Sequence, residues 1–423
     1  MKAVSEGRPE NNVVSFDEAL EIVLARASGL AKPPVEVVGI EDLSGRVLAK
    51  AVKADRDQPP FDRSTRDGFA VWVEDAMAGT WLAVAGEVQA GRPWKGTPLG
   101  GDQAIGIMTG APLPDGADAV VMLEHVERGG VGAMQAIRLA EGRRINAGEN
   151  IVPRGREARE GDEVLAAGTV MDASSVALAA ACGAAMLEVF AVPTVSVLAT
   201  GDELVDVAET PGPGKIRNSN SYGLSALVKQ AGGTPVRLPV APDEREGLER
   251  AILRARQADL MLLSGGVSMG EYDLVKEAML SMGAEFFFTG ARMQPGKPVV
   301  FGRLPECEGM AAVYFFGLPG NPISTQVTFA CFVEPMLRAM RGAAVEGPRF
   351  VQATLAEAVA GRKELTRVLP AELISKRERP EVTLVPWQGS GDMAAHVRAN
   401  CYAVLPPEVE RFAEGDVITV LLK

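Results

Sequence analysis

The sequence predicts a multidomain α/β plus β protein, in which a doubly wound α/β domain lies between two β-rich regions. From Pro193 to Arg341, short apolar runs alternate with segments of helical spacing, as in a largely parallel sheet. Residues 55–146 and 350–423 instead carry short β-like runs separated by Gly and Pro. The length of 423 residues corresponds to about three or four domains of ordinary size.

Composition excludes several classes of function. The net charge of −12 argues against general nucleic-acid binding, which needs a basic face. Two histidines are too few for a histidine-rich metal site, and the cysteines lack the spacing of a zinc site or a disulfide framework. The cysteines are Cys182, Cys307, Cys331 and Cys401. No apolar run reaches membrane length and the polar start resembles no export signal, so we expect a cytoplasmic protein.

In the first 192 residues we expect one longer helix, two shorter helices and a small β domain. Ser15 and Glu18 form a capping box for a helix that ends at Gly29. Shorter helices are expected at Asp42–Ala49 and Ala173–Ala185. The strands expected between them are Trp81–Val84, Gln103–Met108 and Ala119–Leu123.

Three polar segments of this region have more than one reading. The loops Pro60–Ala70 and Thr109–Pro114 are unusual in composition, but their spacing alone favours ordinary surface turns over a functional role. The arginine-rich segment Glu141–Asp162 is an interdomain linker, an anion-facing patch or, by default, a solvated surface.

The α/β region is predicted in detail. Its expected strands are Thr194–Ala199, Val236–Val240, Leu260–Leu263, Phe286–Phe288, Val299–Phe301 and Ala312–Phe316. Its expected helices are Ser221–Gln230, Glu244–Arg256, Glu271–Met282 and Ile323–Met340. We expect Asn220 to cap the first of these helices. In the last 74 residues the clearest strands are Val382–Val385, Cys401–Leu405 and Val417–Leu421, which indicate a small barrel or sandwich.

The stretch Leu260–Asp273 is a buried strand, a Gly-rich turn and a helix start. Glycines let a ligand approach the backbone, and free N–H groups at a helix start favour an anion. Neither of the standard nucleotide-binding fingerprints is present, because no G-x-G-x-x-G occurs and Gly290–Pro298 has the wrong spacing for a P-loop.

Two further loops, TGDEL and GLPGNP, also follow apolar strands, and in a parallel sheet all three converge at one edge. Together they offer backbone N–H groups, hydroxyls and carboxylates. The hydroxyls are those of Thr200, Ser264 and Ser268, and the carboxylates those of Asp202, Glu203 and Asp273. Hydroxyls and amides suit phosphate and carboxylates suit Mg²⁺, so phosphoryl or nucleotidyl chemistry is expected.

The motifs TGDEL, SGGVSMGEYD, PGKP and GLPGNP, preceded by RDGFA and TGAPLP, resemble those of MoeA-type molybdopterin molybdenumtransferases, the family of the gephyrin E domain. The resemblance covers nearly the whole chain. It implies a discontinuous N-terminal domain (1–55 and 147–192), an inserted β domain (56–146), a molybdopterin-binding α/β domain (193–343) and a C-terminal β barrel (344–423). It also implies a homodimer whose active cleft lies between the α/β domain of one subunit and the inserted domain of the other.

The family's reaction inserts molybdate into adenylyl-molybdopterin with Mg²⁺ and releases AMP and molybdenum cofactor. By motif, the resemblance assigns catalysis to Asp67, Asp202, Glu203, Asp243 and Asp273, and Mg²⁺ to Asp202, Glu203 and Asp273. It assigns substrate binding to Thr109, Gly110, Thr200, Gly201, Ser264, Gly265, Gly266, Ser268, Arg292, Lys297, Pro319, Gly320, Asn321 and Pro322. It further implies a molybdopterin adenylyltransferase as donor and molybdoenzymes as acceptors.

Two departures from the family pattern concern substrate preference. Gln294 stands where many members carry a basic residue before PGKP, so one positive charge is missing there and we expect Arg292 to substitute for it. In the linker, Glu157 stands where the family usually has Asp. Because of these changes, the preference for molybdate or tungstate stays open. A scaffold of the gephyrin kind would be expected to have lost its carboxylates, whereas this chain retains them. A molybdopterin adenylyltransferase would need only the α/β domain, whereas this chain has all four domains. Both observations favour the molybdenumtransferase.

Overall fold

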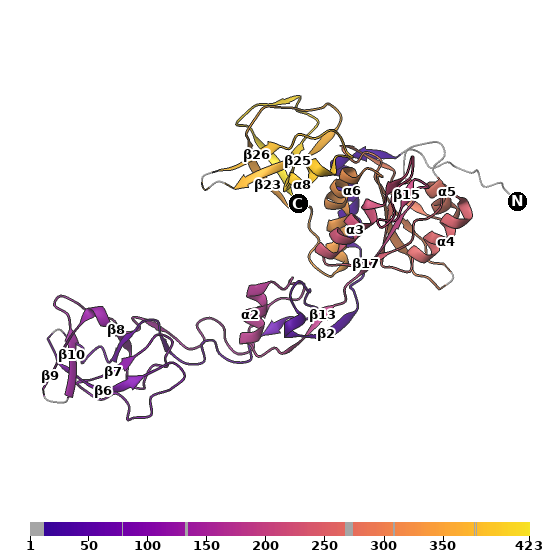
Figure 1. The fold of residues 1–423 in the computed structure, drawn as a ribbon. Coiled ribbons are helices and arrows are strands. Elements are labelled where there is room, and N and C mark those ends of the chain that lie inside the picture. The colour runs from indigo at the N-terminus through magenta and orange to yellow at the C-terminus, as the bar shows by residue number, and fades with distance from the viewer. Residues whose placement is uncertain are drawn as a thin grey trace.

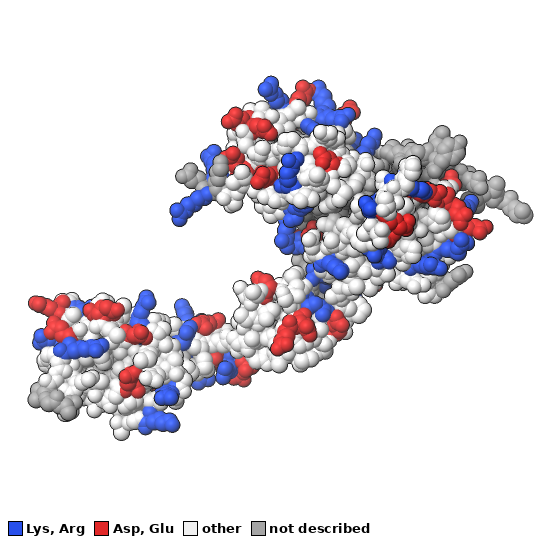
Figure 2. All heavy atoms as spheres, viewed as in Figure 1, with Lys and Arg blue, Asp and Glu red and all other residues white. Residues whose placement is uncertain are grey.

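The structure is a computed structural model that describes residues 12–77, 79–131, 134–266, 274–307, 309–375, 377 and 379–423. Its outline is long: an inserted β-sheet lies at one end, a small linker module in the middle, and an α/β body with a C-terminal barrel at the other end (Figure 1). Of the described residues visible in Figure 2, basic and acidic side chains are interspersed over all three parts rather than gathered into a basic stripe.

The linker module is built from segments on both sides of the insertion. Strand β2 (Val35–Gly39) pairs antiparallel with β13 (Met186–Phe190), and β3 (Val52–Lys53) with β12 (Glu163–Leu165). Helix α2 (Ala173–Ala181) covers them and confirms the predicted small-residue helix, four residues shorter than expected. The chain therefore leaves this module after β3 and returns to it at β12.

The helix expected at Asp42–Ala49 is wrong. Only a short 3-10 turn, η1 (Ile40–Asp42), forms there, and Gly45 follows with φ +76°. Val47 and Leu48 then bridge antiparallel to Val170 and Val189, so their apolar side chains serve a β arrangement. Pairing with residues about 120–140 positions away outweighs the local helical spacing.

Helix α1 (Phe16–Ser28) begins where its capping box predicts. The Ser15 hydroxyl accepts from the Glu18 N–H, the Glu18 carboxylate accepts from the Ser15 N–H, and Gly29 ends the helix. Its buried face packs on the α/β body, where the Phe16 ring lies 5.7 Å from that of Phe332. Strand β1 (Val13–Ser15), just before it, pairs parallel with a later strand, β20 (Gly290–Gln294).

The inserted region is a six-stranded sheet of order β8-β5-β7-β6-β10-β9. Its strands are β5 (Gly68–Val71), β6 (Leu82–Val88), β7 (Gln103–Ile107), β8 (Ala119–Met122), β9 (Val126–Val131) and β10 (Met134–Leu139), with a short turn η2 (Leu123–His125). Strand β4 (Arg63–Ser64) enters it beside β11 (Ile151–Val152). The small β domain is thus confirmed.

The α/β body holds a sheet of order β17-β14-β18-β22-β21-β19. The first four strands run parallel, whereas β21 and β19 are antiparallel to their neighbours, so the predicted largely parallel sheet is mixed at one side. The strands are β14 (Thr194–Ala199), β17 (Thr234–Arg237), β18 (Leu260–Ser264), β19 (Glu285–Phe288), β21 (Val300–Leu304) and β22 (Val313–Leu318). Two short strands, β15 (Leu204–Val205) and β16 (Ile216–Arg217), form a separate parallel pair.

Helices cover both faces of this sheet, as a doubly wound fold requires. The helices are α3 (Ser219–Gln230), α4 (Arg245–Ala255), α5 (Leu274–Ser281), α6 (Pro322–Thr328) and α7 (Glu334–Met340), the last two joined through a π-helical segment η3 (Phe329–Val333). Leu260 and Leu262 of β18 pack with α3, α6 and α7, while Met261 and Leu263 pack with α4 and α5. The continuous apolar run of β18 is therefore buried on two faces.

The C-terminal region is a barrel. Five strands form a closed circuit, because β25 pairs with both β26 and β27 and the others connect in the order β26-β23-β29-β27. These strands are β23 (Phe350–Leu355), β25 (Thr366–Ser375), β26 (Pro380–Leu384), β27 (Cys401–Leu405) and β29 (Val417–Leu422). The remaining elements are β24 (Val359–Ala360), β28 (Arg411–Phe412) and α8 (Met393–Arg398). In the described part of the chain, no helix is long and apolar enough to cross a membrane.

Candidate active site

Three loops of the α/β body meet at one edge of its sheet. In the parallel register Ala199 lies beside Ser264, and Ser264 lies beside Leu318, so the loops after β14, β18 and β22 start at the same level. They border a pocket of about 300 Å³. Its lining residues come from these loops, from the segment before α3 and from the barrel: Ala199, Thr200, Glu203, Leu204, Ile216, Arg217, Asn218, Ser219, Asn220, Ser264, Gly265, Gly320, Asn321, Pro322 and Gly391.

Asn220 ties two of the loops together. Its amide nitrogen Nδ2 donates to the Ser264 hydroxyl at 2.9 Å and to the Gly320 carbonyl at 2.8 Å. The predicted capping role of Asn220 is wrong: α3 begins two residues earlier, and Asn218 caps it by accepting from the Ser221 N–H. Because Asn218 caps the helix, the Asn220 side chain can bond the two loops and line the pocket.

Glycines bring the second loop close to the first. Gly265 has φ +87° and Gly266 φ +62°, and a Cβ on Gly265 would lie 2.6 Å from the Thr200 carbonyl oxygen. Any side chain at Gly265 would therefore push the loops apart. The Thr200 hydroxyl beneath them is buried and has no hydrogen-bond partner among the described residues. A buried polar atom of this kind favours a ligand at the pocket.

Two predicted acidic residues face each other at the mouth of this edge. The Asp202 N–H donates to the Asp243 carboxylate at 3.2 Å, and the Asp243 N–H donates to the Asp202 carboxylate at 3.3 Å. Lys215 contacts the Asp202 carbonyl, and Glu203 lines the pocket itself. Ser268 and Asp273 lie outside the described residues. Within those residues, no three His, Cys, Asp or Glu side chains gather closely enough to hold a metal ion.

The third loop starts helix α6 with Asn321 at the cap and Pro322 in the first turn. The Thr325 hydroxyl donates to the Pro319 carbonyl at 2.5 Å, which fixes the loop to the helix. From the barrel, the Ser390 carbonyl accepts from the Ile323 N–H at 3.0 Å, so the segment that carries Gly391 lies against the pocket.

The predicted basic residues Arg292 and Lys297 are not among the side chains that line this pocket. Arg292 donates to the Val13 carbonyl at 3.2 Å and pairs with Glu18 at 3.6 Å, on the side of α1. Lys297 is exposed on the turn before β21, whose Val300 pairs with Gly317 near the end of β22. The turn therefore approaches the same edge of the sheet.

The Gln294 departure has a neighbour that restores a charge. The Arg362 guanidinium, from the barrel, donates to the Gln294 side-chain oxygen at 3.2 Å. A basic group thus stands beside this position although its own side chain is neutral. Sequence reasoning chose Arg292 for this purpose, because nothing in the spacing links residue 362 to residue 294.

Asp67 and Thr109 form a second candidate group, in the inserted sheet. One oxygen of the Asp67 carboxylate, Oδ1, accepts from the Thr109 N–H at 2.7 Å and from its hydroxyl at 2.9 Å. These bonds, the N–H first, hold the pKa of Asp67 below its usual range, so the group is ionised at neutral pH. Gly110, with φ +81°, donates its N–H to the Ser64 carbonyl and turns the loop back toward Asp67.

Within one chain these two groups are far apart. Asp67 directly precedes β5 and Thr109 follows β7, and the inserted sheet that contains these strands lies at the opposite end of the molecule from α3 and α6, which border the pocket (Figure 1). One chain therefore does not assemble the two halves of the predicted site.

Family models of known proteins match nearly the full length of this chain. Residues 14–183 match the MoeA N-terminal region (domain I and II), residues 196–339 a probable molybdopterin binding domain, and residues 352–423 the MoeA C-terminal region (domain IV). The molybdopterin molybdenumtransferase of Haemophilus influenzae is 33% identical across 91% of this chain and 93% of its own length. The chain belongs to the MoeA family.

Further relatives agree with this membership. A molybdopterin molybdenumtransferase of Staphylococcus aureus is 31% identical across 98% of this chain and 96% of its own length. Two solved MoeA structures from Pyrococcus horikoshii have TM-scores of 0.73 and 0.79, at 31% and 27% identity, and each aligns with 97% of this chain. They align with 99% and 100% of the respective Pyrococcus chains.

In this MoeA-family chain, sequence reasoning missed several residues that line the pocket, among them Asn220, Arg217 and Gly391. Asn220 was assigned to helix capping, Arg217 stands in a short strand with no recognisable motif, and Gly391 belongs to a barrel loop in which no site residue was predicted. The contribution of Gly391 depends on how the barrel docks, for which the sequence holds no local signal. Asn220 carried one clue, since a second polar residue, Asn218, stands near the helix start.

Proposed function

We propose that the protein is a molybdopterin molybdenumtransferase that inserts molybdate into adenylyl-molybdopterin and releases AMP and molybdenum cofactor. The observation that carries the proposal is similarity of 30–33% identity, over nearly the full length, to proteins of that name. The pocket chemistry supports it, because hydroxyls, loop amides and carboxylates suit an anionic substrate together with a cation.

The residues of the pocket have separable roles in this proposal. The amides of the 264–266 turn and the hydroxyls of Thr200 and Ser264 bind phosphate oxygens, and Asn220 holds the loops at the required spacing. The Asp67 carboxylate accepts both hydrogen bonds from Thr109 at Oδ1, and Oδ2 makes no hydrogen bond to another described residue. We assign Oδ2 to a hydrogen-bond donor of the pterin substrate. Lys297, Arg292 and Arg362 provide positive charge near the substrate anion.

We propose Asp202, Glu203 and Asp273 as ligands of Mg²⁺, which prefers carboxylate and carbonyl oxygens. The described residues alone do not bring three such side chains together, so this site depends on Asp273, which lies outside them. Glu203 lines the pocket and Asp202 is adjacent to it in the chain, and Asp273 completes the proposed ligands. Bound Mg²⁺ would supply charge neutralisation at the pyrophosphate link. Asp243, which contacts Asp202, holds that loop in place. Without a cation, the carboxylates would repel the substrate.

Assembly is part of the proposal. A homodimer with a shared cleft would place the Asp67–Thr109 group of one subunit at the pocket of the other, since the two groups lie far apart in one chain (Figure 1). The limits 1–55 with 147–192, 56–146, 193–343 and 344–423 remain our division into domains. We further propose a cytoplasmic protein that receives substrate from a molybdopterin adenylyltransferase and serves molybdoenzymes.

The test is an assay of the purified protein with adenylyl-molybdopterin, Mg²⁺ and either molybdate or tungstate. We expect AMP release and active cofactor with at least one oxyanion, and no AMP without Mg²⁺. Conversion of molybdopterin and ATP into adenylyl-molybdopterin would instead indicate an adenylyltransferase. Tight binding of adenylyl-molybdopterin without AMP release under any of these conditions would contradict the proposal and favour a scaffold.

A further inference from the structure

The inserted sheet is joined to the linker module by a neck, which we define as residues 55–63 and 152–162. Figure 1 shows these two segments as the only ribbon drawn between the two bodies. Main-chain bonds hold them side by side: the Gln58 N–H donates to the Ala158 carbonyl at 2.7 Å, and the Gly155 N–H to the Pro59 carbonyl at 3.0 Å. These bonds set the pairing of the segments.

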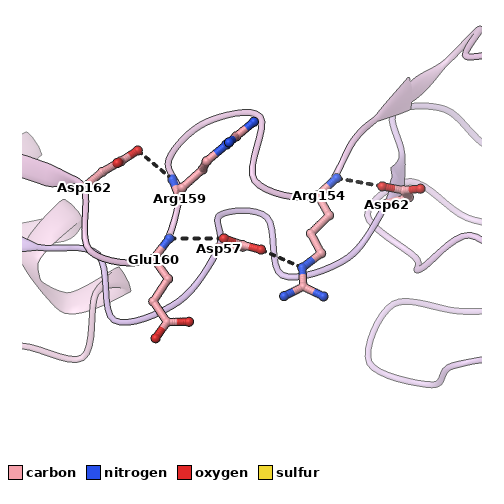
Figure 3. A network of polar contacts seen from close by, with 6 residues as sticks. All are labelled: Asp57, Asp62, Arg154, Arg159, Glu160 and Asp162. Atoms are coloured by element: carbon pink, nitrogen blue, oxygen red, sulfur yellow. Dashed lines mark hydrogen bonds and ion pairs between the residues drawn. The ribbon is translucent and has the colours of Figure 1, made fainter.

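Three carboxylates add bonds across the neck, and Figure 3 shows two of them, Asp57 and Asp62. The third, Glu157, accepts from the Arg63 guanidinium at 2.7 Å. The Asp57 carboxylate accepts from the Glu160 N–H at 3.1 Å and from the Arg154 side-chain nitrogen Nε at 2.7 Å. The Asp62 carboxylate accepts from the Arg154 N–H at 2.7 Å. Arg154 is therefore bound through its backbone at Asp62, toward the sheet, and through its side chain at Asp57, toward the linker module.

Apolar packing contributes little to the neck. Its described side chains are mostly exposed, with Pro59 buried, and the Arg154 side chain is 64% and the Asp57 side chain 25% exposed. The apolar clusters lie on either side, one in the linker module and one in the inserted sheet. A single exposed ion pair is weak, but carboxylates that accept from fixed backbone N–H groups restrict orientation as well as distance.

We propose that Asp57 and Arg154 are positioning residues, which fix the angle of the inserted sheet so that the Asp67–Thr109 group meets a pocket of the α/β body. This inference rests on the proposed function. The neck reaches this group through the main chain, because the Leu113 N–H donates to the Asp62 carbonyl at 2.8 Å and the Gly110 N–H donates to the Ser64 carbonyl at 2.8 Å. A rotation of the neck therefore turns the loop that carries Thr109, and Asp67 with it. The bonds from Glu160 and Arg154 also keep the pKa of Asp57 below its usual range, so the carboxylate is charged at neutral pH.

The variants are Arg154→Ala and Asp57→Ala, with Arg154→Lys as the conservative change. Arg156→Ala is the matched control, because Arg156 lies two residues away in the same neck, is exposed, and makes no side-chain hydrogen bond or ion pair with another described residue. The thermal midpoint checks that each variant is folded. Neither Asp57 nor Arg154 belongs to a hydrophobic core, so we expect the midpoints to match that of the wild type.

The first measurement is the distance distribution between spin labels at Gln135→Cys in the inserted sheet and Met186→Cys in the linker module. Cys307, the half-buried native cysteine, is replaced by serine, and labelled chains are diluted with unlabelled ones. We expect a narrow distribution in the wild type and the Arg156→Ala control, a broad one in Arg154→Ala and Asp57→Ala, and an intermediate one in Arg154→Lys. Narrow distributions in all variants would overturn the inference.

The second measurement separates the inference from the proposed function. We expect kcat for AMP release to fall about 10- to 100-fold in Arg154→Ala, since small misplacement of a reacting group has effects of that size. KM for adenylyl-molybdopterin should change much less than kcat, because the pocket residues are untouched and only the Asp67 contact is misplaced. A broad distance distribution with unchanged kcat would refute the positioning role. If the wild type released no AMP, the proposed function would fail, and narrow distributions in every variant would still refute the role of the neck.

Discussion

Asn220 is a residue whose single side chain joins two loops of the pocket. Asn220→Ala would leave the Ser264 hydroxyl and the Gly320 carbonyl without this donor. We expect molybdopterin to bind roughly tenfold more weakly, the effect of losing about 1.4 kcal/mol of hydrogen bonding. Asn400→Ala, which removes two side-chain bonds to Leu373 in the barrel, is the control and should bind normally. Calorimetric titration checks both; equal affinities would remove Asn220 from the site.

His396 is a buried residue with a pH-dependent consequence. Burial, with a smaller contribution from Lys423, lowers the pKa of His396 to about 4, and its ring nitrogen Nε2 contacts the Tyr402 hydroxyl at 2.9 Å. The unfolded chain takes up this proton near pH 6.5, so it binds more protons than the folded state between that pH and 4. Folding stability should therefore fall as pH is lowered through this window, by at most about 1.4 kcal/mol per pH unit.

Selective labelling of histidine rings measures this directly, because the chain has only two histidines. An NMR titration of the His125→Gln variant reports His396 alone. We expect a midpoint near 4 and, in His396→Gln, a weaker loss of stability between pH 6.5 and 4. A midpoint of 6 or above would contradict the buried, neutral state.

At the residue scale, a site residue could be predicted when the sequence immediately around it forms a recognisable motif. Asp202, Glu203 and Asp67 stand in recognisable loops, and the structure places Glu203 at the pocket and Asp67 on Thr109. Asn220 could not be assigned correctly, because its role depends on a hydroxyl 44 residues and a carbonyl 100 residues away. Helix capping is the ordinary expectation for such a residue, and Asn218 fulfils it instead.

Among the elements, strand β5 has the least space for change. A Cβ at Gly68 would lie 1.9 Å from the Val121 carbonyl oxygen of β8. Gly68→Ala should therefore separate β5 from β8, disorder the inserted sheet and abolish AMP release, while the α/β body stays folded. Gly39→Ala, at an open position with nothing within 4 Å, should leave fold and activity unchanged.

The tryptophans give a direct readout of this change. Trp72, Trp81 and Trp94 belong to the inserted region and Trp387 to the C-terminal region, so near-ultraviolet circular dichroism reports mainly on the insertion. We expect most of this signal to disappear in Gly68→Ala with only a small change in helix content. A wild-type spectrum would show that β5 and β8 tolerate the methyl group.

Elements with strong local signals were predictable. The Ser15 capping box and the uninterrupted apolar run of β18 both form as expected. Strand β20 was missed, because its pairing partners are β1, about 277 residues earlier, and β25. A segment whose partners are this distant has no periodic pattern of its own to identify it.

At the scale of the whole molecule, the order of modules was predictable and their arrangement was not. Gly- and Pro-punctuated strands on both sides of the α/β alternation indicated the β-rich regions. The segment Glu141–Asp162, whose last part forms one half of the neck, was by contrast interpreted as a solvated surface by default, because arginines such as Arg154 have no spacing that identifies a partner. Only the fold brings Asp57 and Arg154, 97 residues apart, to 2.7 Å.

The central claim is that one active site uses the Asp67–Thr109 group of one subunit and the α/β pocket of another. It is tested most directly by mixing two inactive variants, Asp67→Ala and Glu203→Ala, under conditions that exchange subunits. A hybrid dimer would contain one site with both defects and one site with none, so we predict partial recovery of AMP release, up to about half the wild-type rate per hybrid. Hybrids of verified composition that remain as inactive as the parent variants would contradict a shared site.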